Sequence, residues 1–234
     1  MSDQVSQIIT KAYSEGRQFL LEPEANEVCK IYGLPVAKIK VATSPEMAVQ
    51  CFEEMGTPVV LKIVSPDILH KSDAGGVIVG LNNANAVREG YQKIMENVRK
   101  YKPDANIIGI LVQEMAPQST EVIVGMTNDP TFGPTIMFGL GGIFVEVLKD
   151  VSFRIAPIKR EDAYEMIKEI KSFKILTGAR GREPADLDAL ADVLLGVSKL
   201  VTERNEIASL DLNPVFAYAK GAKVVDTRII LAKK

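Results

Sequence analysis

The only histidine of the chain, His70, is the first side chain in this sequence that could do chemistry. It lies in LKIVSPDILHKSDAGGV, residues 61–77, a polar loop between two apolar strands that is bounded by a proline and a glycine pair. A neutral imidazole is a good nucleophile toward phosphorus, and Asp67 or Asp73 could orient its ring. A structural or merely exposed histidine is the alternative that the residue alone leaves open.

A second group consists of oxygen ligands near the C-terminus. Asp211 and Asn213 share one face of the predicted strand LDLNPV, because side chains alternate along a strand. Folding a hairpin about residues 219–221 brings Asp226 opposite Asn213 or one diagonal step away. Two carboxylates and a carboxamide suit Mg²⁺, which prefers a few protein oxygens together with phosphates and water. Solvated acids near a hairpin turn are the competing interpretation.

Cationic side chains interrupt two apolar strands. Lys62 stands in VVLKIV, where burial is costly unless the ammonium meets water or an anion. Its stem could instead snorkel at the sheet margin. Arg154 interrupts SFRIAPI, and Arg180 and Arg182 lie in the loop TGARGRE. All three arginines could meet anionic groups or remain solvated.

Two acidic residues and a glycine-rich turn complete the candidates. Glu114 and Glu121 flank a proline turn and could face one cleft from adjacent strands, or could simply be surface glutamates. The stretch FGLGGIF, residues 138–144, has bare amides that could cradle a phosphate. It matches neither GxGxxG nor GxxxxGK[ST], so a tight glycine turn explains it equally well.

The composition is that of an ordinary globular protein. Of the 234 residues, 47% are hydrophobic and 25% are charged, and the net charge of −2 predicts no general attraction to nucleic acid or to an anionic membrane. The apolar runs are too short for a transmembrane helix, and the N-terminus lacks the apolar core of a signal peptide. Cys29 and Cys51 are expected to be buried thiols of a cytoplasmic protein. A single histidine excludes a histidine-rich zinc site.

Hydrophobic periodicity and turn residues predict the elements that must position these side chains. Helices are expected over 3–20, 23–32, 45–55, 85–101, 160–170 and 185–202. Strands are expected over 36–42, 58–64, 75–81, 107–115, 120–128, 134–140, 143–149, 151–158, 207–218 and 223–231. No flexible linker separates the two halves, whose boundary is predicted within LVQEMAP, residues 111–117. Two α+β lobes joined in this way usually hold a ligand between them.

Together these segments resemble the ATP-grasp β subunits of ADP-forming acyl-CoA synthetases, the acetate–CoA ligases that make ATP from acyl-CoA, ADP and phosphate. The resemblance covers nearly the whole chain and is most specific in VVLKIVSPDILHKSDAGGVIVGL, LVQEMAPQSTEVIVGMTNDPTFGPTIMFGLGGIFVEVLKDVSFRIAPI and SLDLNPV. It implies one α+β ATP-grasp unit over 1–234, with the nucleotide in a cleft between two lobes. These lobes would span 22–110, with a phosphohistidine loop at 65–76, and 111–234, with the helix of residues 1–21 packed on the latter.

The resemblance also implies roles for individual residues. His70 would be a phosphohistidine that takes a phosphoryl group from a histidine of a partner α subunit and passes it to ADP. Mg²⁺ would bind to Asn213 and Asp226, with Asp211 close by. The nucleotide would be bound by Lys62 at its phosphates, Glu114 and Met115 at the adenine, Glu121 at the ribose, the Gly141–Gly142 turn at the transferred phosphoryl group, and additionally Gln113 and Arg154.

The same resemblance implies a CoA-binding α subunit, in an α₂β₂ assembly, because no segment here is recognised as a CoA or acyl site. GDP and GTP remain possible substrates beside ADP and ATP. One alternative is a regulatory nucleotide-binding module without chemistry of its own, against which the HKSD loop argues. Others are a succinyl-CoA-synthetase-like nucleotide subunit, whose relatives carry the phosphohistidine on the other subunit, and a self-sufficient carboxylate–amine ligase.

Overall fold

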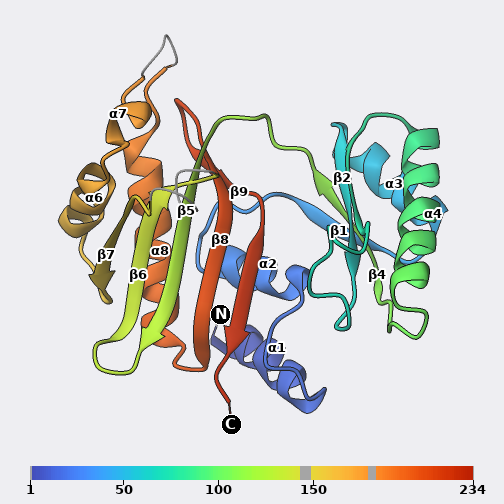
Figure 1. The fold of residues 1–234 in the computed structure, drawn as a ribbon, viewed down its shortest axis with the longest axis horizontal. Coiled ribbons are helices and arrows are strands. Elements are labelled where there is room, and N and C mark those ends of the chain that lie inside the picture. The colour runs from blue at the N-terminus through green and yellow to red at the C-terminus, as the bar shows by residue number, and fades with distance from the viewer. Residues whose placement is uncertain (1, 143–148, 179–182, 234) are drawn as a thin grey trace. The chain divides into compact units, whose positions relative to one another are not determined.

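The computed structural model describes residues 2–142, 149–178 and 183–233. These residues form two compact units, a smaller one of residues 37–117 and a larger one of residues 1–36 and 118–234. Each unit is built on its own antiparallel sheet, as Figure 1 shows.

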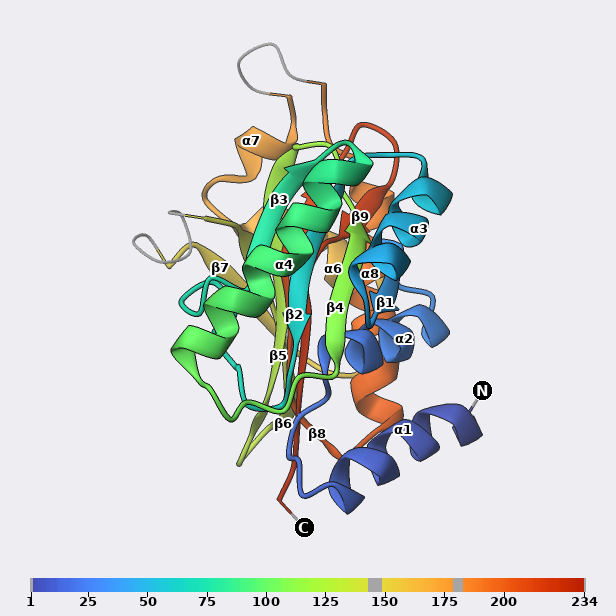
Figure 2. The same cartoon turned by 90° about the vertical axis from the view of Figure 1, so that its right-hand side faces the viewer.

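The smaller unit is a four-stranded sheet with two helices on one face. Its strand order is β1-β4-β2-β3. The strands are β1 (Ile39–Ala42), β2 (Val59–Val64), β3 (Val77–Leu81) and β4 (Gly109–Glu114). Helices α3 (Pro45–Met55) and α4 (Ala84–Tyr101) pack on one face, and Figure 2 shows α4 lying across β2 and β3. One hydrophobic core lies between these helices and the sheet.

Local sequence signals fix where these two helices begin and end. Ser44 caps α3 by accepting a hydrogen bond from the Met47 amide, and Pro45 occupies the first turn, where its missing N–H costs nothing. The helix ends at Gly56, whose φ of 64° is left-handed and therefore favours glycine. Asn83 caps α4 in the same way as Ser44 caps α3.

The larger unit contains a six-stranded sheet. Its strand order is β10-β8-β5-β6-β7, with β9 paired to β8. The strands are β5 (Thr120–Asp129), β6 (Gly133–Leu140), β7 (Val151–Ile155), β8 (Ile207–Ala217), β9 (Ala222–Val224) and β10 (Thr227–Leu231). The helices are α1 (Ser2–Ser14), α2 (Glu22–Ile31), α6 (Arg160–Glu169), α7 (Phe173–Leu176) and α8 (Leu187–Glu203).

The two faces of this sheet differ in character. Figure 1 shows α2, α6 and α8 behind the strands, and the buried residues of β5, β6 and β8 form one core with these helices. Alternation sends Leu210 and Leu212 into that core and Asp211 to the other face. We call this other face the second face; it carries Gly125, Asp211, Arg228 and Phe153, which line one open groove.

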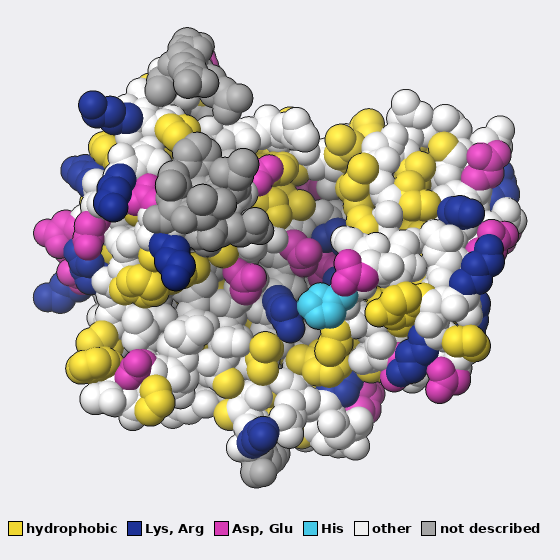
Figure 3. Space-filling view, viewed as in Figure 1, with side chains coloured by type: hydrophobic (Ala, Val, Ile, Leu, Met, Phe, Trp, Pro, Cys, Tyr) yellow, Lys and Arg dark blue, Asp and Glu magenta, His cyan; other side chains and the backbone are white. Residues whose placement is uncertain are grey.

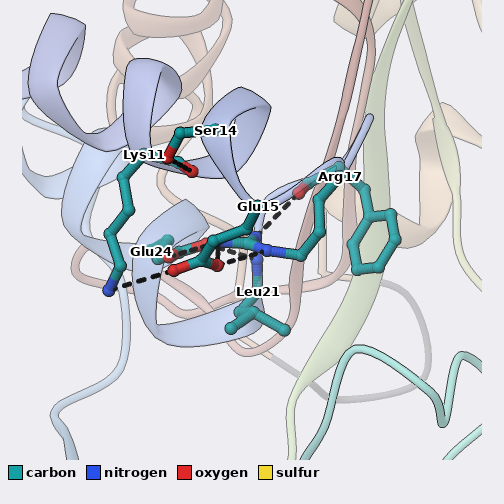
Figure 4. Close-up of polar contacts among 7 residues, drawn as sticks. Lys11, Ser14, Glu15, Arg17, Leu21 and Glu24 are labelled. Atoms are coloured by element: carbon teal, nitrogen blue, oxygen red, sulfur yellow. Dashed lines mark hydrogen bonds and ion pairs between the residues drawn. The ribbon is translucent and has the colours of Figure 1, made fainter.

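An ion-pair cluster joins the end of α1 to the start of α2. The Arg17 guanidinium is only 6% exposed and binds both carboxylate oxygens of Glu24, at 2.7 and 2.9 Å, and one oxygen of Glu15 (Figure 4). The following residues run along β10, where the Leu20 amide donates to the Ile229 carbonyl. Residues 17–20 therefore cover the edge of the sheet that β10 would otherwise expose.

The observed division of the chain differs from the predicted lobes of 22–110 and 111–234. Helix α2 contributes Val28 and Cys29 to the core of the larger unit, and Val36 bridges to Val224, so residues 22–36 belong there. Strand β4 pairs with β1 and β2, which keeps it within the smaller unit up to Pro117.

Most predicted elements are present, with shifted ends. The predicted strand 223–231 is interrupted and forms β9 and β10, and the short helix α7 was not predicted. The predicted strand 143–149 lies almost wholly outside the described residues. Within the described part of the chain, no helix combines the length and apolarity needed to cross a bilayer.

Candidate functional site

His70 is presented at the tip of the segment that joins β2 to β3. Its side chain is exposed, and Figure 3 shows the single cyan side chain at the surface. The backbone behind it is closed into a turn: the His70 carbonyl accepts from the Ala74 amide at 3.3 Å, and the Lys71 carbonyl accepts from the Gly76 amide at 2.7 Å. The His70 imidazole is therefore accessible while its backbone is held in a turn.

Asp67 does not orient the His70 ring, contrary to one of the two expectations. Its carboxylate accepts from the Lys102 ammonium at 3.1 Å and from the Asn106 amide at 2.7 Å. The hydrogen bond from the Asn106 amide, followed by that from Lys102, holds the pKa of Asp67 below its usual range. Asp67 thus fastens the start of the segment, and Asp73, which is exposed, remains the candidate for orienting the ring.

Lys62 lies on the face of the smaller sheet that points away from α3 and α4. Leu61 and Ile63 belong to the core on the helix side, so alternation places Lys62 on the opposite face, paired with Val77 and Leu111. Only 6% of Lys62 is exposed. Gln113 follows Leu111 on the same face and is 1% exposed.

The end of β4 uses its amides internally. The Glu114 amide donates to the Lys38 carbonyl and the Met115 amide to the Pro58 carbonyl, so both N–H groups are used within the smaller unit. The Lys38 amide donates to the Glu114 side chain, at 2.9 Å, rather than to its carbonyl. Because Pro58 has no N–H, it returns no hydrogen bond to Met115. The Met115 carbonyl, not the two amides, is thus the backbone group that this strand end can offer.

Glu121 and the Gly141–Gly142 turn are brought together in the larger unit. The Gly141 amide donates to the Glu121 carbonyl at 2.7 Å, and a Cβ on Gly141 would lie 2.9 Å from the Glu121 Cβ. Gly142 has a φ of +65°, which favours glycine for a second reason. Glu121 also lines an open cavity of about 610 Å³ with Thr120, Ala217 and Tyr218, a volume in the range of small-molecule sites.

The three predicted metal ligands lie where two strands are irregular. The Asn213 amide donates to the Asp226 carbonyl at 3.3 Å, as the hairpin register predicts. The β5–β8 register shifts between Val122 and Val124, which marks a bulge in β8 at residues 213–214. Asp226 lies in the break between β9 and β10. Bulges re-aim side chains and are frequent beside active sites.

The electrostatics of this place fit a divalent cation. Burial raises the pKa of Asp211, the Asp226 carboxylate raises it further, and Arg228, its cross-strand partner, opposes the rise. Within the described ranges no three His, Cys, Asp or Glu side chains converge. Two carboxylates and the Asn213 amide oxygen would therefore hold Mg²⁺ together with phosphate and water oxygens.

Arg154, predicted to bind the nucleotide, lies on the face of β7 opposite to the second face. On β7 it alternates with Phe153, and Phe153 is the residue that lines the groove of the second face with Asp211. The Arg154 guanidinium lies 2.8 Å from Glu169 and 3.6 Å from Glu165, both on α6. Ion pairs with these carboxylates, on the helix side of the sheet, give the Arg154 charge partners without a bound nucleotide. Arg180 and Arg182 lie outside the described residues.

Two contacts of the site were missed in the sequence. Arg228 faces Asp211 across the hairpin, and the register that paired Asp226 with Asn213 could have found it. Asn97, on α4, donates to the Gly75 carbonyl at 3.0 Å. In the sequence, Asn97 could have been found as a polar residue three positions after Ile94, where the apolar stripe of the helix continues.

Comparisons with known proteins agree with these arrangements. Residues 11–231 match the model of the ATP-grasp domain family. The chain is 56% identical over 225 residues to the β subunit of acetate–CoA ligase (ADP-forming) I of Pyrococcus furiosus, covering 96% of this chain and 97% of the relative.

Two solved structures of Ca. Korarchaeum cryptofilum acetyl-coenzyme A synthetase 1 are similar over 97% of this chain and 100% of theirs. One contains coenzyme A, acetyl-coenzyme A and a phosphorylated phosphohistidine segment in the site I orientation, with 52% identity and a TM-score of 0.92. The other contains coenzyme A and Mg-AMPPCP, with the phosphohistidine segment pointing towards the nucleotide-binding site, 50% identity and a TM-score of 0.87. The chain therefore belongs to the ATP-grasp family, among the β subunits of ADP-forming acetate–CoA ligases.

Proposed function

We propose that this chain is the nucleotide-binding, phosphoryl-transferring subunit of an ADP-forming acyl-CoA synthetase, which converts acyl-CoA, ADP and phosphate to a carboxylic acid, ATP and CoA. The observation that carries the proposal is the placement of His70. The only histidine of the chain is exposed at the tip of a segment whose two ends are tied to the same unit. Such a side chain can receive a phosphoryl group and present it elsewhere.

The step at His70 is an exchange of one bond to phosphorus for another. In the direction of ATP formation, a terminal phosphate oxygen of ADP attacks the phosphorus carried on an imidazole nitrogen. The new O–P bond forms as the N–P bond breaks, and the electron pair of that bond stays on the nitrogen. In the reverse direction the imidazole nitrogen attacks the γ-phosphorus of ATP and ADP leaves.

The other residues bind and orient the nucleotide. The Lys62 ammonium neutralises phosphate charge, the Glu121 carboxylate accepts from ribose hydroxyls, and the amides of the Gly141–Gly142 turn receive the phosphoryl oxygens. Asp226 and Asn213, with Asp211 close by, would hold Mg²⁺, which would neutralise charge on the nucleotide phosphates. Gln113 lies on the same face as Lys62 and belongs to the same site.

Backbone carbonyls at the end of β4 favour adenine. A carbonyl such as that of Met115 accepts a hydrogen bond from the exocyclic amino group of adenine, whereas guanine presents an oxygen at that position. ADP and ATP are therefore expected to be preferred over GDP and GTP. Met115 is 39% exposed, so a ligand can reach this strand end.

We assign acyl-CoA chemistry to a CoA-binding α subunit, in an α₂β₂ assembly in the cytoplasm. The β-subunit name of the Pyrococcus furiosus relative supports a partner of this kind. The experiment is co-expression of the chain with a candidate α subunit, followed by an assay of ATP formed from ADP, phosphate and acetyl-CoA. ATP formation by the complex, and by neither subunit alone, is expected. A complex that forms no ATP but still binds Mg·ADP would favour a regulatory nucleotide-binding module instead.

A further inference from the structure

The phosphohistidine segment of this chain is tied at both ends to one helix and to the residues that follow it. At its start, Asp67 binds Lys102 and the Asn106 amide, just after α4. At its end, the Asn97 amide group on α4 donates to the Gly75 carbonyl at 3.0 Å. Between these ties the side chains of Ile68 and Ala74 are 3% and 4% exposed and belong to the core beneath α4.

Glycine at position 75 leaves space for the close contact between the segment and the Asn97 side chain. A Cβ on Gly75 would lie 2.7 Å from Asn97 Nδ2, closer than real Cβ contacts come. The φ of Gly75, +61°, independently favours glycine. Asparagine is a poor helix former, yet Asn97 sits on the last turns of an 18-residue helix, next to the buried Val98. Its contribution there is the hydrogen bond to the segment.

The tie is transmitted to His70 through a short, closed turn. The Gly75 amide donates to the Ser72 carbonyl, and the Ala74 amide donates to the His70 carbonyl. With Ile68 in the core, the His70 Cα stays within about 7 Å of the Ile68 Cα, the reach of two extended residues. A displacement of Gly75 therefore moves a turn that is only a few residues long and carries the nucleophile at its other end.

We propose that Asn97 is a positioning residue for phosphoryl transfer, whose side-chain amide holds Gly75 and thereby sets the orientation of His70. This inference rests on the proposed function. Without the amide donor the segment samples more orientations, so His70 is in line with the transferred phosphorus less often. Nucleotide binding, which uses other residues, is unaffected.

The test is a single-turnover labelling of the full chain with γ-labelled Mg·ATP, over a range of ATP concentrations. Asn97→Asp keeps the shape of the side chain but replaces the donor with an acceptor. Its saturating rate constant is expected to fall about fivefold, the factor that corresponds to one net hydrogen bond of about 1 kcal/mol. The ATP concentration at half-saturation should not change. Gln92→Glu makes the same amide-to-acid change at an exposed position of α4 and should behave as wild type.

Hydrogen exchange separates this inference from the proposed function. Amides of residues 70–76 should exchange faster in Asn97→Asp than in wild type, while those of β2 should not, and the melting temperature of the variant should confirm folding. Equal exchange in both proteins, or a changed half-saturation with an unchanged rate constant, would overturn the positioning role. Absence of label from the wild type would count against the proposed function, and the exchange comparison would still decide whether Asn97 holds the segment.

Discussion

The amide of Asn213 donates to the carbonyl of Asp226, and this pair sits where β8 bulges and where β9 gives way to β10. A regular hairpin would have continued both strands through these residues. The irregularity leaves Asn213 exposed and Asp226 half-buried, beside the half-buried Asp211. The two strands thus place three oxygen-bearing side chains near one another without a long intervening loop.

Removing Asp226 should therefore separate metal binding from stability. In Asp226→Ala, the Mg²⁺-dependent part of ADP affinity should fall by at least tenfold, because a charged oxygen ligand is lost. The apo protein should not lose stability, since Asp226 repels the half-buried Asp211. Calorimetric titration with ADP, with and without Mg²⁺, measures the difference. An unchanged Mg²⁺ dependence would show that Asp226 is not a ligand.

Lys62 offers a test of whether its buried charge serves the nucleotide. Lys62→Met keeps the apolar stem and removes the charge. ADP affinity should fall roughly 10- to 100-fold, the range expected for one charge-assisted hydrogen bond, with little change in melting temperature. Lys93→Met, at an exposed position of α4, is the matched control. A large drop in melting temperature with normal affinity would support a structural lysine.

Base selectivity follows from the end of β4. Because carbonyls rather than amides are offered there, ADP should bind at least tenfold more tightly than GDP, since a carbonyl facing the guanine oxygen leaves two acceptors unpaired. Competition between the two nucleotides for the wild-type chain measures this ratio. Equal affinities would mean that the base is bound by other groups.

Asp186 links pH to the stability of the hairpin that carries Asn213 and Asp226. Its carboxylate accepts from the Gly221 amide at 2.8 Å and caps α8 at Ala189, and these hydrogen bonds lower its pKa. A carboxyl with a lowered folded-state pKa stabilises the fold above the unfolded pKa of about 3.9, and the benefit is lost as the pH falls through the folded value.

We therefore expect the melting temperature of Asp186→Asn to be lower than that of wild type at pH 7 and close to it at pH 2. Asparagine is also a good helix cap, so this variant can keep the cap at Ala189, but it loses the charge and, because its NH₂ group cannot accept, the hydrogen bond from Gly221. Melting temperatures of both proteins between pH 2 and pH 7 provide the measurement. Parallel curves over the whole range would mean that the Asp186 charge does not contribute.

The sequence predicted best what depends on alternation and short-range register. Alternation within β2 gives the face of the sheet on which Lys62 lies, and the hairpin register gives the pairing of Asn213 with Asp226. The ends of α3 at Ser44 and Gly56 follow from residues next to them in the sequence. The same alternation places Phe153, not Arg154, on the second face, so the predicted role of Arg154 at the nucleotide gains no support from this groove.

Long-range partners were not predictable in this way. Asp67 was expected near the imidazole, but its partners lie 35 and 39 residues further along the chain, at Lys102 and Asn106. Glu114 and Met115 were expected to offer backbone groups to a base, and the sequence did not show that their amides donate to the carbonyls of Lys38 and Pro58. Helix α2 joined the other unit because its apolar face packs beside β10, which lies some 200 residues later.

The most direct test of the account is labelling of the full chain with γ-labelled Mg·ATP, with and without the α subunit. Wild type should become labelled, and the label should be labile in acid and stable in alkali, as a phosphoramidate is. Ser72→Ala, in the same segment, should be labelled like wild type, whereas His70→Asn should not be labelled at all. Label that persists in His70→Asn, or that survives acid, would contradict the central claim that His70 carries the phosphoryl group.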